Sequence, residues 1–440
     1  MSYSQTASAE CLAAKAAKVD SWLTSVLEPL SCTSAKTVYL APWNHGIGSS
    51  IHIFALAALH AIDYNYTVVA VDEPTPWIFA DQATCLNTDG RLTHECYLQP
   101  LSTCANLTRV IRFSGARPAN NPRVFAMLAR QGVRDIFWNW KEHAVFWRFA
   151  QRFQEPLIKM EQLPHLARRW GVSLNFVLSR LIARILRPQP LLQRQIERDT
   201  RWVAHILHGA ADAPRRVVVG VHVRISEFWR GDPRSPVPIE TYMDLADAWL
   251  RALGARGRDA AIFVASDVAL SPAVQHAWHR HRNHTVAALP RTLAPPGQMA
   301  EAFVRQVANG SVVHGGKRVT VAMLALEALA DLFLLARSDL YLGTMGNFAE
   351  LLLPLRLAQD PLGSVYFDSR VILSDRKRGV TVWSAREDDS QLNLLLAAAS
   401  VYGGDSYFNI SSMYPEDLTA GMLGVMVTSV SVSVETRRSD

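Results

Sequence analysis

Two basic residues close a strongly β-branched segment, and two acidic residues follow them. His222 and Arg224 end the run 216–224, where the alternation of a strand places both side chains on one face. An arginine in that place suits a bidentate contact with a phosphate, and an interdomain salt bridge is the alternative. Glu227 and Asp232 follow on a loop, where they could act as a general base for a hydroxyl group or be ordinary solvated carboxylates. This group is therefore predicted to bind a phosphate and to activate an acceptor.

A glycine-rich turn stands between a predicted strand and a predicted helix near the N-terminus. It contains Gly46 and Gly48 within the stretch His45–Ser50. Glycine permits a tight turn in which backbone N–H groups approach a phosphate, and the N-terminus of the following helix adds a favourable dipole. The third glycine of a dinucleotide-binding fingerprint is missing, so a purely structural turn is an equally good explanation.

Three further polar residues accompany apolar elements in the second half of the chain. Asp267 ends an apolar run, Asp331 lies within an amphipathic helical pattern, and Asn347 closes the glycine-punctuated turn 343–347. Ligands of open α/β sheets bind at the carboxyl ends of the strands. Each signal is weak by itself, and together they indicate a nucleotide site.

The elements that must position these residues alternate between strand and helix in two blocks. The first block is predicted to contain strands at 37–41, 66–71 and 110–113 and a helix at 50–62. The second block is predicted to contain strands at 216–224, 260–265 and 339–343 and helices at 239–253, 322–337 and 347–357. Between the blocks, residues 135–208 are predicted to be helical, with a break at Arg187–Pro190. The tryptophans of this segment are expected to be core residues rather than a stacking platform for an acceptor.

Alternation of strand and helix is typical of parallel α/β layers. The predicted fold class is therefore α/β, with two Rossmann-like domains facing a cleft, the GT-B architecture of many nucleotide-sugar transferases. The length of 440 residues favours two or three domains. The predicted divisions are a helical lead-in at 1–35, an N-terminal α/β domain with a helical C-terminal part at 36–210, a Rossmann-like nucleotide-sugar-binding domain at 211–400 and a tail at 401–440.

The composition excludes several classes of protein. Hydrophobic residues make up 49% and charged residues 19% of the chain, which excludes disorder, a coiled coil and a collagenous chain. The longest apolar stretch, 321–336, is interrupted by Glu327 and Asp331, so it is not expected to span a membrane. The net charge of +6 mildly favours an anionic partner. No basic block with interleaved aromatic residues occurs, so a nucleotide diphosphate is favoured over nucleic acid.

Cysteine and asparagine patterns indicate an oxidising, lumenal compartment. The five cysteines all lie in the first quarter of the chain, at Cys11, Cys32, Cys85, Cys96 and Cys104. This clustering favours disulfides over a zinc site, and we expect two disulfides, with one pair drawn from the last three cysteines. Acceptor patterns for N-glycosylation begin at Asn65, Asn106, Asn283, Asn309 and Asn409. Residues 1–10 lack the features of a signal peptide or anchor, so either an upstream anchor is missing from this chain or the protein is not lumenal.

No metal site is expected. The sequence contains no Asp-x-Asp, which argues against a transferase that holds a nucleotide diphosphate through a divalent cation. The histidines at 276, 279, 281 and 284 are interspersed with arginines, which favours an exposed basic helix end over a set of metal ligands. The stretch 310–318 misses the Walker A spacing, and no G-x-S-x-G of a hydrolase occurs.

A linear series of motifs resembles a known family. In chain order the motifs are Leu186-Arg-Pro-Gln-Pro190, Val219-Gly-Val-His-Val-Arg224, Pro238-Ile-Glu-Thr-Tyr242, Phe263-Val-Ala-Ser-Asp267 and Asp331-Leu-Phe-Leu-Leu-Ala-Arg-Ser-Asp-Leu-Tyr-Leu-Gly-Thr344. In order and spacing they resemble the alpha-1,6-fucosyltransferases, which place core fucose on N-glycans and have relatives in bacterial nodulation fucosyltransferases. The resemblance covers roughly residues 36–360, including His45–His52 as the family's Gly-x-Gly turn and Cys85–Cys104 as its cysteine-bearing loop.

The resemblance implies an inverting GT-B enzyme that uses GDP-fucose as donor and requires no metal or other cofactor. It also implies a glycan or glycoprotein acceptor, the N-glycan core GlcNAc, and a location in the Golgi lumen or secretory pathway. By position in the motifs, Gly46 and Gly48 would contact the diphosphate, Arg224 would hold the β-phosphate, His222 and Asp331 would recognise guanine, Asp267 would support the nucleotide pocket, and Asn347 would replace a phosphate-contacting serine.

The sequence also departs from the family pattern. Ile225 replaces a second arginine, Glu227-Phe228 replaces an Asp-Lys pair, and Gly346-Asn347 replaces a serine pair. The family's catalytic glutamate aligns near Asp232, but the segment before Tyr242 is one residue longer, so Asp232 and Glu227 are both candidates for the base. Three hypotheses stay open: an active fucosyltransferase, an inactive lectin-like homologue that binds a GDP-sugar, and a transferase for another GDP-sugar.

Overall fold

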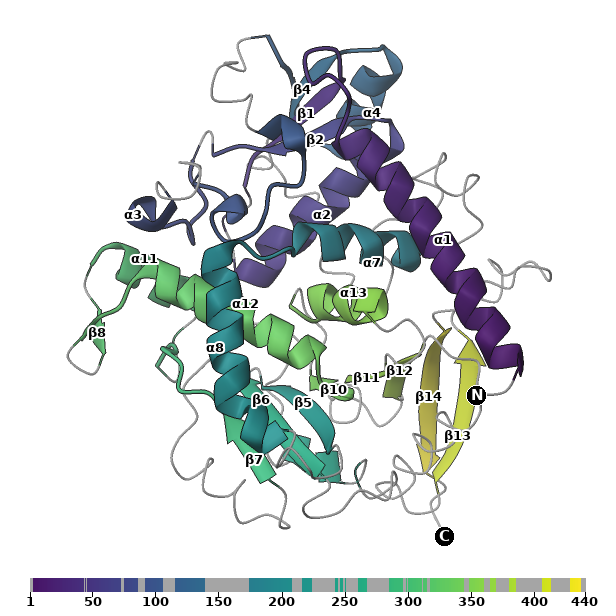
Figure 1. The fold of residues 1–440 in the computed structure, drawn as a ribbon, viewed down its shortest axis with the longest axis vertical. Coiled ribbons are helices and arrows are strands. Elements are labelled where there is room, and N and C mark those ends of the chain that lie inside the picture. The colour runs from purple at the N-terminus through teal and green to yellow at the C-terminus, as the bar shows by residue number, and fades with distance from the viewer. Residues whose placement is uncertain are drawn as a thin grey trace.

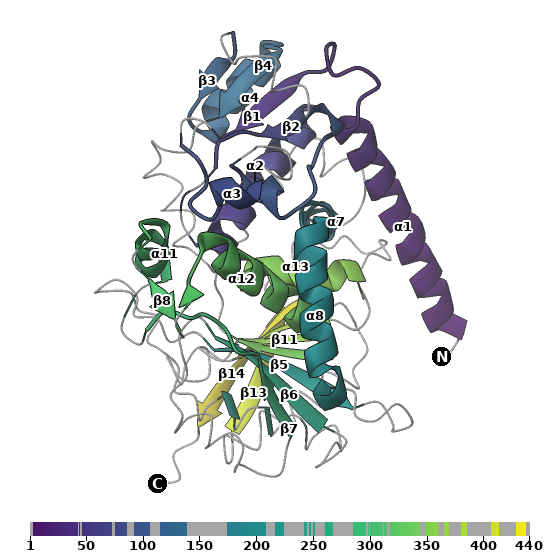
Figure 2. The same ribbon diagram turned by 60° about the vertical axis from the view of Figure 1, so that its left-hand side comes forward.

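A computed structural model of the chain shows two α/β halves (Figures 1 and 2). The residues that it describes are 3–42, 44, 46–72, 75–85, 92–105, 115–138, 174–207, 216–223, 242–243, 246–247, 250, 260–266, 285–295, 298, 300–310, 312–314, 317–343, 348–359, 365–368, 380–384, 406–412 and 428–436.

The first half is built on a four-stranded parallel sheet in the order β2-β1-β4-β3. The strands are β1 (Thr37–Leu40), β2 (Thr67–Ala70), β3 (Arg117–Ala119) and β4 (Asp135–Trp138). Helix α2 (Ile47–Asp63) connects β1 to β2 and is buried along nearly its whole length, and α4 (Pro122–Arg130) connects β3 to β4. Since the chain moves from β1 to β2 on one side and later places β4 on the other, the order of this sheet reverses between β1 and β4.

The second half is built on an eight-stranded sheet in the order β13-β14-β12-β11-β10-β5-β6-β7. The strands β11, β10, β5, β6 and β7 are parallel, and β12, β14 and β13 are each antiparallel to their neighbours. Their bounds are β5 (Val217–Val223), β6 (Ala260–Ser266), β7 (Thr285–Ala288), β10 (Leu340–Gly343), β11 (Val365–Asp368), β12 (Val380–Ser384), β13 (Ser406–Ser412) and β14 (Thr428–Thr436).

Helices fill the space between the two sheets, which lie at opposite ends of the molecule in both views (Figures 1 and 2). The long helices are α1 (Tyr3–Leu27), α7 (Leu174–Ile185), α8 (Pro190–Leu207), α11 (Ala300–Ala308), α12 (Val321–Ala336) and α13 (Ala349–Gln359). Shorter elements are α3 (Gln82–Cys85), the 3-10 turn η1 (His94–Cys96) and the pair β8 (Val313–His314) and β9 (Lys317–Arg318). Helix α7 packs on both α2 and α13, and one hydrophobic core runs through both halves.

The predicted α/β fold class with two Rossmann-like sheets is confirmed. The helix predicted for 135–208 is wrong at its beginning, where Asp135–Trp138 forms β4 between β1 and β3. Ile136 and Trp138 are fully buried there on one face of the strand, and β-branched and aromatic side chains suit such a position. The strand predicted at 110–113 lies outside the described residues.

The predicted domain divisions remain predictions. Helix α8 precedes residue 211 in the chain, but it packs against α12, β6 and β7 of the second half. Within 401–440, the strands β13 and β14 extend the second sheet. Helix α1 supplies the predicted helical lead-in and packs on α2 and α7.

Two disulfides join four of the five cysteines, as predicted. Cys85 bonds to Cys96 across α3 and η1, and Cys32 bonds to Cys104. The second bond closes a loop with a sequence separation of 72 residues, which restricts the unfolded chain. None of the described helices combines the length with the apolar character that a membrane span requires.

Two histidines are buried in the aromatic core of the first half. His60 packs against Phe125 and Trp138, with ring centroids 5.4 and 5.9 Å apart, and His94 lies 4.3 Å from the Phe54 ring. Burial lowers the pKa of each histidine to about 4. The unfolded chain therefore takes up these protons near pH 6.5, before the folded protein does.

Acid is expected to destabilise the fold through these two side chains. The free energy of unfolding that the two neutral histidines contribute is fully present above pH 6.5. It is lost as the pH falls toward 4, by about 3 kcal/mol for each histidine. Urea unfolding at pH 7, 5.5 and 4 measures this loss, and His94→Phe, which keeps an aromatic contact with Phe54, should remove about half of it. If His94→Phe and the wild type lose the same unfolding free energy between pH 7 and pH 4, His94 does not carry the effect.

Candidate functional site

The order of the second sheet reverses between β5 and β10. From β5 the chain adds β6 and then β7 on one side, and it returns to place β10 and β11 on the other. In open α/β sheets, a ligand-binding crevice forms at the carboxyl ends of the strands where the order reverses. His222 is the penultimate residue of β5, and β10 ends at Gly343, shortly before α13 begins at Ala349. Two of the features singled out in the sequence therefore meet at this edge.

The ring of His222 stacks on Phe348, which directly precedes α13. The ring centroids are 4.6 Å apart and the ring planes meet at 23°. His222 is 8% exposed, so the stack holds the imidazole at the carboxyl edge of β5 with little solvent around it. Sequence reasoning did not identify Phe348, although its place directly after the turn 343–347 was a usable signal.

The packing of α12 against β5 predicts that Asp331 lies near the level of His222 along the sheet. A Cβ atom at Gly220 would overlap Ser338 and lie 3.1 Å from Leu335, so this face of β5 packs against the end of α12. His222 shares that face, two residues farther along the strand. Asp331 precedes Leu335 by one helical turn, and α12 runs back along the sheet because a short connection joins it to β10. A helical turn and two strand residues both advance about 6 Å, so the two residues are expected at similar heights along the sheet.

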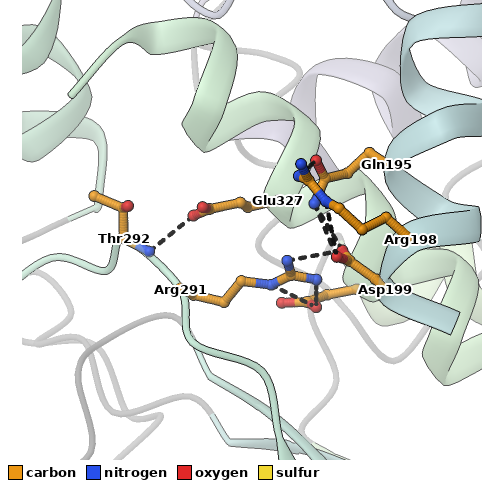
Figure 3. A network of polar contacts seen from close by, with 7 residues as sticks. Gln195, Arg198, Asp199, Arg291, Thr292 and Glu327 are labelled. Carbon is orange, nitrogen blue, oxygen red and sulfur yellow. Dashed lines mark hydrogen bonds and ion pairs between the residues drawn. The ribbon is translucent and has the colours of Figure 1, made fainter. Parts of the chain in front are cut away.

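The Asp331 carboxylate belongs to a buried ionic network (Figure 3). Arg291, from the segment after β7, donates to Asp331 Oδ1 from Nε at 3.0 Å and from Nη2 at 2.5 Å. Its Nη1 lies 2.8 Å from Asp199 Oδ2 on α8. The three side chains are 5%, 9% and 7% exposed for Arg291, Asp331 and Asp199. The network therefore joins α8, α12 and the exit of β7 around one buried guanidinium.

Burial and charge act in opposite directions within this network. Burial raises the pKa of Asp331 and repulsion from Asp199 adds to the rise, whereas Arg291 opposes it. Burial lowers the pKa of Arg291, but the two aspartates together raise it above its usual value, so the guanidinium stays charged. Glu327, one turn before Asp331 on α12, accepts a hydrogen bond of 2.8 Å from the Thr292 amide, and burial raises its pKa.

Gln195 and Arg198 complete the network on α8 (Figure 3). Gln195 donates to both carboxylate oxygens of Asp199, at 3.0 and 2.8 Å. Arg198 donates to Gln195 and lies 3.9 Å from Asp199, but its side chain is 69% exposed. Arg198 therefore touches the outer side of the network, and Arg291 supplies the charge inside it.

The glycine-rich turn of the first half follows β1, beside the place where the order of the first sheet reverses. Gly46 is the N-cap of α2, with φ −52° and ψ 152°, and no side chain caps the helix there. Helix α2 begins at Ile47, earlier than predicted, so Gly48 lies in the first helical turn. The dihedral angles of Gly46 are open to any residue, so close approach of a ligand is a better reason for glycine than backbone freedom.

Asn44 organises the loop beside this turn, which sequence reasoning did not foresee. Its Nδ2 donates to Thr75 Oγ1 at 3.2 Å and to the Pro76 carbonyl at 3.0 Å, and its Oδ1 accepts from the Ile78 amide at 3.0 Å. One amide side chain thus ties the exit of β1 to the loop that follows β2.

The remaining predicted site residues are Arg224, Glu227, Asp232, Asp267 and Asn347, and they lie outside the described residues. Arg224 follows the last residue of β5, and Asp267 follows the last residue of β6. Within the described ranges, no group of three His, Cys, Asp or Glu side chains is placed to hold a metal ion.

No family model and no curated protein matches the sequence. Among solved structures, the chain is similar to the fucosyltransferase NodZ from Bradyrhizobium, at 15% identity over 80% of this chain and 99% of that one, with a TM-score of 0.40. It is also similar to a mutant of Arabidopsis thaliana FUT1 in complex with GDP, at 12% identity over 80% and 74% of the two chains, with a TM-score of 0.39. POFUT1 in complex with GDP-fucose gives 11% identity over 76% and 97%, with a TM-score of 0.38. At these values the likeness establishes no family membership.

Proposed function

We propose that this protein is a glycosyltransferase that transfers fucose from GDP-fucose to a glycan, with its two halves arranged as in GT-B enzymes. The observation that carries the proposal is the stack of His222 on Phe348 where the order of the second sheet reverses. Asp331, which the motif resemblance assigns to guanine together with His222, is expected near the same level of the sheet, because α12 packs against β5. Asp267 and Asn347 would line the same crevice from the ends of neighbouring strands.

The reaction would be a single inverting displacement. A carboxylate, Asp232 or Glu227, takes the proton of an acceptor hydroxyl as that oxygen attacks the anomeric carbon from the face opposite GDP. Negative charge then grows on the β-phosphate, where Arg224 and the backbone N–H groups at Gly46 and Gly48 would stabilise it. The N-terminus of α2 suits that task because no side chain caps it.

Two departures from the family pattern argue against catalytic turnover. Ile225 and Phe228 stand where the resembling family has an arginine and a lysine. Each missing charge-assisted contact would raise the activation free energy by on the order of 1.5 to 3 kcal/mol, which would slow the reaction about tenfold to a hundredfold. A homologue that binds the donor without transferring it is therefore the second candidate, and a transferase for another GDP-sugar is the third.

The finer parts of the proposal are the linkage and the compartment. An alpha-1,6 linkage to the core GlcNAc of N-glycans follows from the motif resemblance alone. The two disulfides support an oxidising compartment such as the Golgi lumen. Asn65 and Asn309, which begin two of the glycosylation patterns, are exposed in the structure.

Release of GDP from GDP-fucose, with and without N-glycan acceptors, tests the proposed function. A transferase is expected to release GDP faster when the acceptor is present, and to prefer GDP-fucose over GDP-mannose and UDP-sugars. Tight donor binding without acceptor-dependent release would select the inactive homologue, and preference for another GDP-sugar would select the third candidate. Preference for a UDP-sugar would contradict the proposal.

Activity is expected to persist in excess EDTA, because an arginine and backbone amides, rather than a metal ion, are proposed to neutralise the diphosphate. The acceptor-dependent rate should change by less than about twofold on chelation, which corresponds to a negligible change in activation free energy. Loss of activity that added magnesium or manganese restores would overturn the metal-independent mechanism.

A further inference from the structure

The Arg291 side chain is more deeply buried than its place in the chain predicts. Arg291 lies in a segment after β7 that is neither helix nor strand, yet its side chain is only 5% exposed and pairs with carboxylates of α8 and α12. A buried guanidinium carries a large desolvation cost unless carboxylates pair with it, and Asp199 and Asp331 do so here. The chain therefore brings a charge from the β7 exit to one particular carboxylate on α12.

The pairing leaves Asp331 with one occupied and one available oxygen. Both hydrogen bonds from Arg291 end on Oδ1, and no described residue donates a hydrogen bond to Oδ2. The two bonds from one rigid fork fix the rotation of the carboxylate. Oδ2 is then held in one direction, near the level of the sheet that the packing of α12 on β5 predicts for His222.

We propose that Arg291 is a positioning residue of the donor site, which holds Asp331 so that Oδ2 accepts N–H groups of a guanine base. This inference rests on the proposed function, because Asp331 meets guanine only if the chain binds a guanine nucleotide. Guanine offers N–H donors, so the Asp331 carboxylate must be ionised to accept them. A proton on Oδ2 would place donor against donor and weaken binding.

The charges that face Asp331 come from three elements. Arg291 lies after β7, Asp199 is on α8, and Glu327 is one turn away on α12. Arg291 is the only buried cation among these groups in the described network. Removing it would leave buried carboxylates that repel one another, and burial already raises the pKa of Asp331. Protonation of Asp331 would then extend to higher pH.

A purely structural role makes a different prediction. Arg291 also ties α8 to α12, so its loss is expected to lower the melting temperature in either case. If it acted only as a tie, folded molecules would keep the wild-type affinity for GDP at every pH. The pH dependence of GDP affinity therefore separates positioning from stabilisation.

Calorimetric titration of GDP from pH 5.5 to 8.5 tests the inference on the full chain and on three variants. Arg291→Gln is expected to weaken GDP binding at least about tenfold at pH 7 and to regain affinity as the pH rises and Asp331 ionises. Arg291→Lys should lie between it and the wild type, because lysine restores the charge without the fork. Arg198→Gln, which alters the exposed arginine of the same network, should change affinity less than about twofold.

The outcomes distinguish the inference from the proposed function. Wild-type affinity and pH profile in both Arg291 variants, with lowered melting temperatures, would overturn the positioning role and leave the proposed function intact. If Arg291→Gln does not fold, Arg291→Lys decides, and an unchanged profile in that variant overturns the inference. A folded wild-type protein that does not bind GDP would overturn the inference and the proposed function together.

Discussion

Arg224→Ala is expected to reduce kcat/KM for GDP-fucose at least about a hundredfold and to weaken GDP binding. Arg224 directly follows Val223 at the carboxyl end of β5, the central strand where the order of the second sheet reverses. A guanidinium placed there would meet a phosphate that gains negative charge in the transition state. The effect should therefore be larger on kcat/KM than on GDP affinity, and steady-state kinetics with calorimetry measures both.

Two further variants, Arg224→Lys and Arg216→Ala, test whether the effect depends on the guanidinium of Arg224. Arg224→Lys should recover little activity, because a point charge does not replace the bidentate fork. Arg216→Ala provides a matched control at the amino end of the same strand, on the side away from the proposed ligand, and should retain activity within about threefold. Unchanged GDP affinity in Arg224→Ala would remove Arg224 from the site.

Asp232→Asn is expected to lower kcat by roughly a hundredfold to ten-thousandfold while GDP-fucose binding is retained. A general base is needed for the chemical step and makes no required contact with the donor in the ground state. Asp232 stands five residues after Glu227 in the sequence, and Gly231 is expected to let the chain bend toward the acceptor. Single-turnover kinetics with a donor titration separates binding from transfer.

Glu227→Gln is the comparison for the base assignment. Glu227 stands three residues after Arg224, where a carboxylate would orient the arginine, so this variant should weaken donor binding as well as turnover. The assignment is reversed if Asp232→Asn keeps near-normal kcat while Glu227→Gln binds the donor and does not transfer fucose.

Local apolar patterns predicted much of the fold. The β-branched run before Arg224 forms β5, and the long apolar helix before Ser338 forms α12, each close to its predicted bounds. The short aromatic strand Asp135–Trp138 was missed because the sequence after it has a helical pattern and its own pattern fits either structure. Residues 135–138 form a strand because they pair with β1 and β3. Local sequence patterns do not show this pairing, since it forms only in the folded chain.

Long-range contacts explain what sequence reasoning missed in the site. His222 and Asp331 were identified from their positions in a predicted strand and a predicted helix, and local sequence patterns are enough to predict such elements. Phe348 and Arg291 were not, because their roles depend on partners far away in the chain: Arg291 meets one aspartate on α8 and another on α12. The start of α2 at Ile47 was also missed, since glycine at Gly48 weakens a helical pattern that burial of α2 then overrides.

Titration of the full chain with GDP-fucose in the presence of EDTA tests the central claim most directly. We expect saturable binding of one donor per chain and weaker binding of UDP-sugars. His222→Ala should lose most of the affinity, because the His222 ring stacks on Phe348 where the order of the sheet reverses. Phe348→Ala should weaken binding by a smaller factor, because it removes the stacking contact and keeps the imidazole itself. A folded chain that binds no GDP-fucose, or that binds it equally well after His222→Ala, would contradict the placement of the donor at this edge.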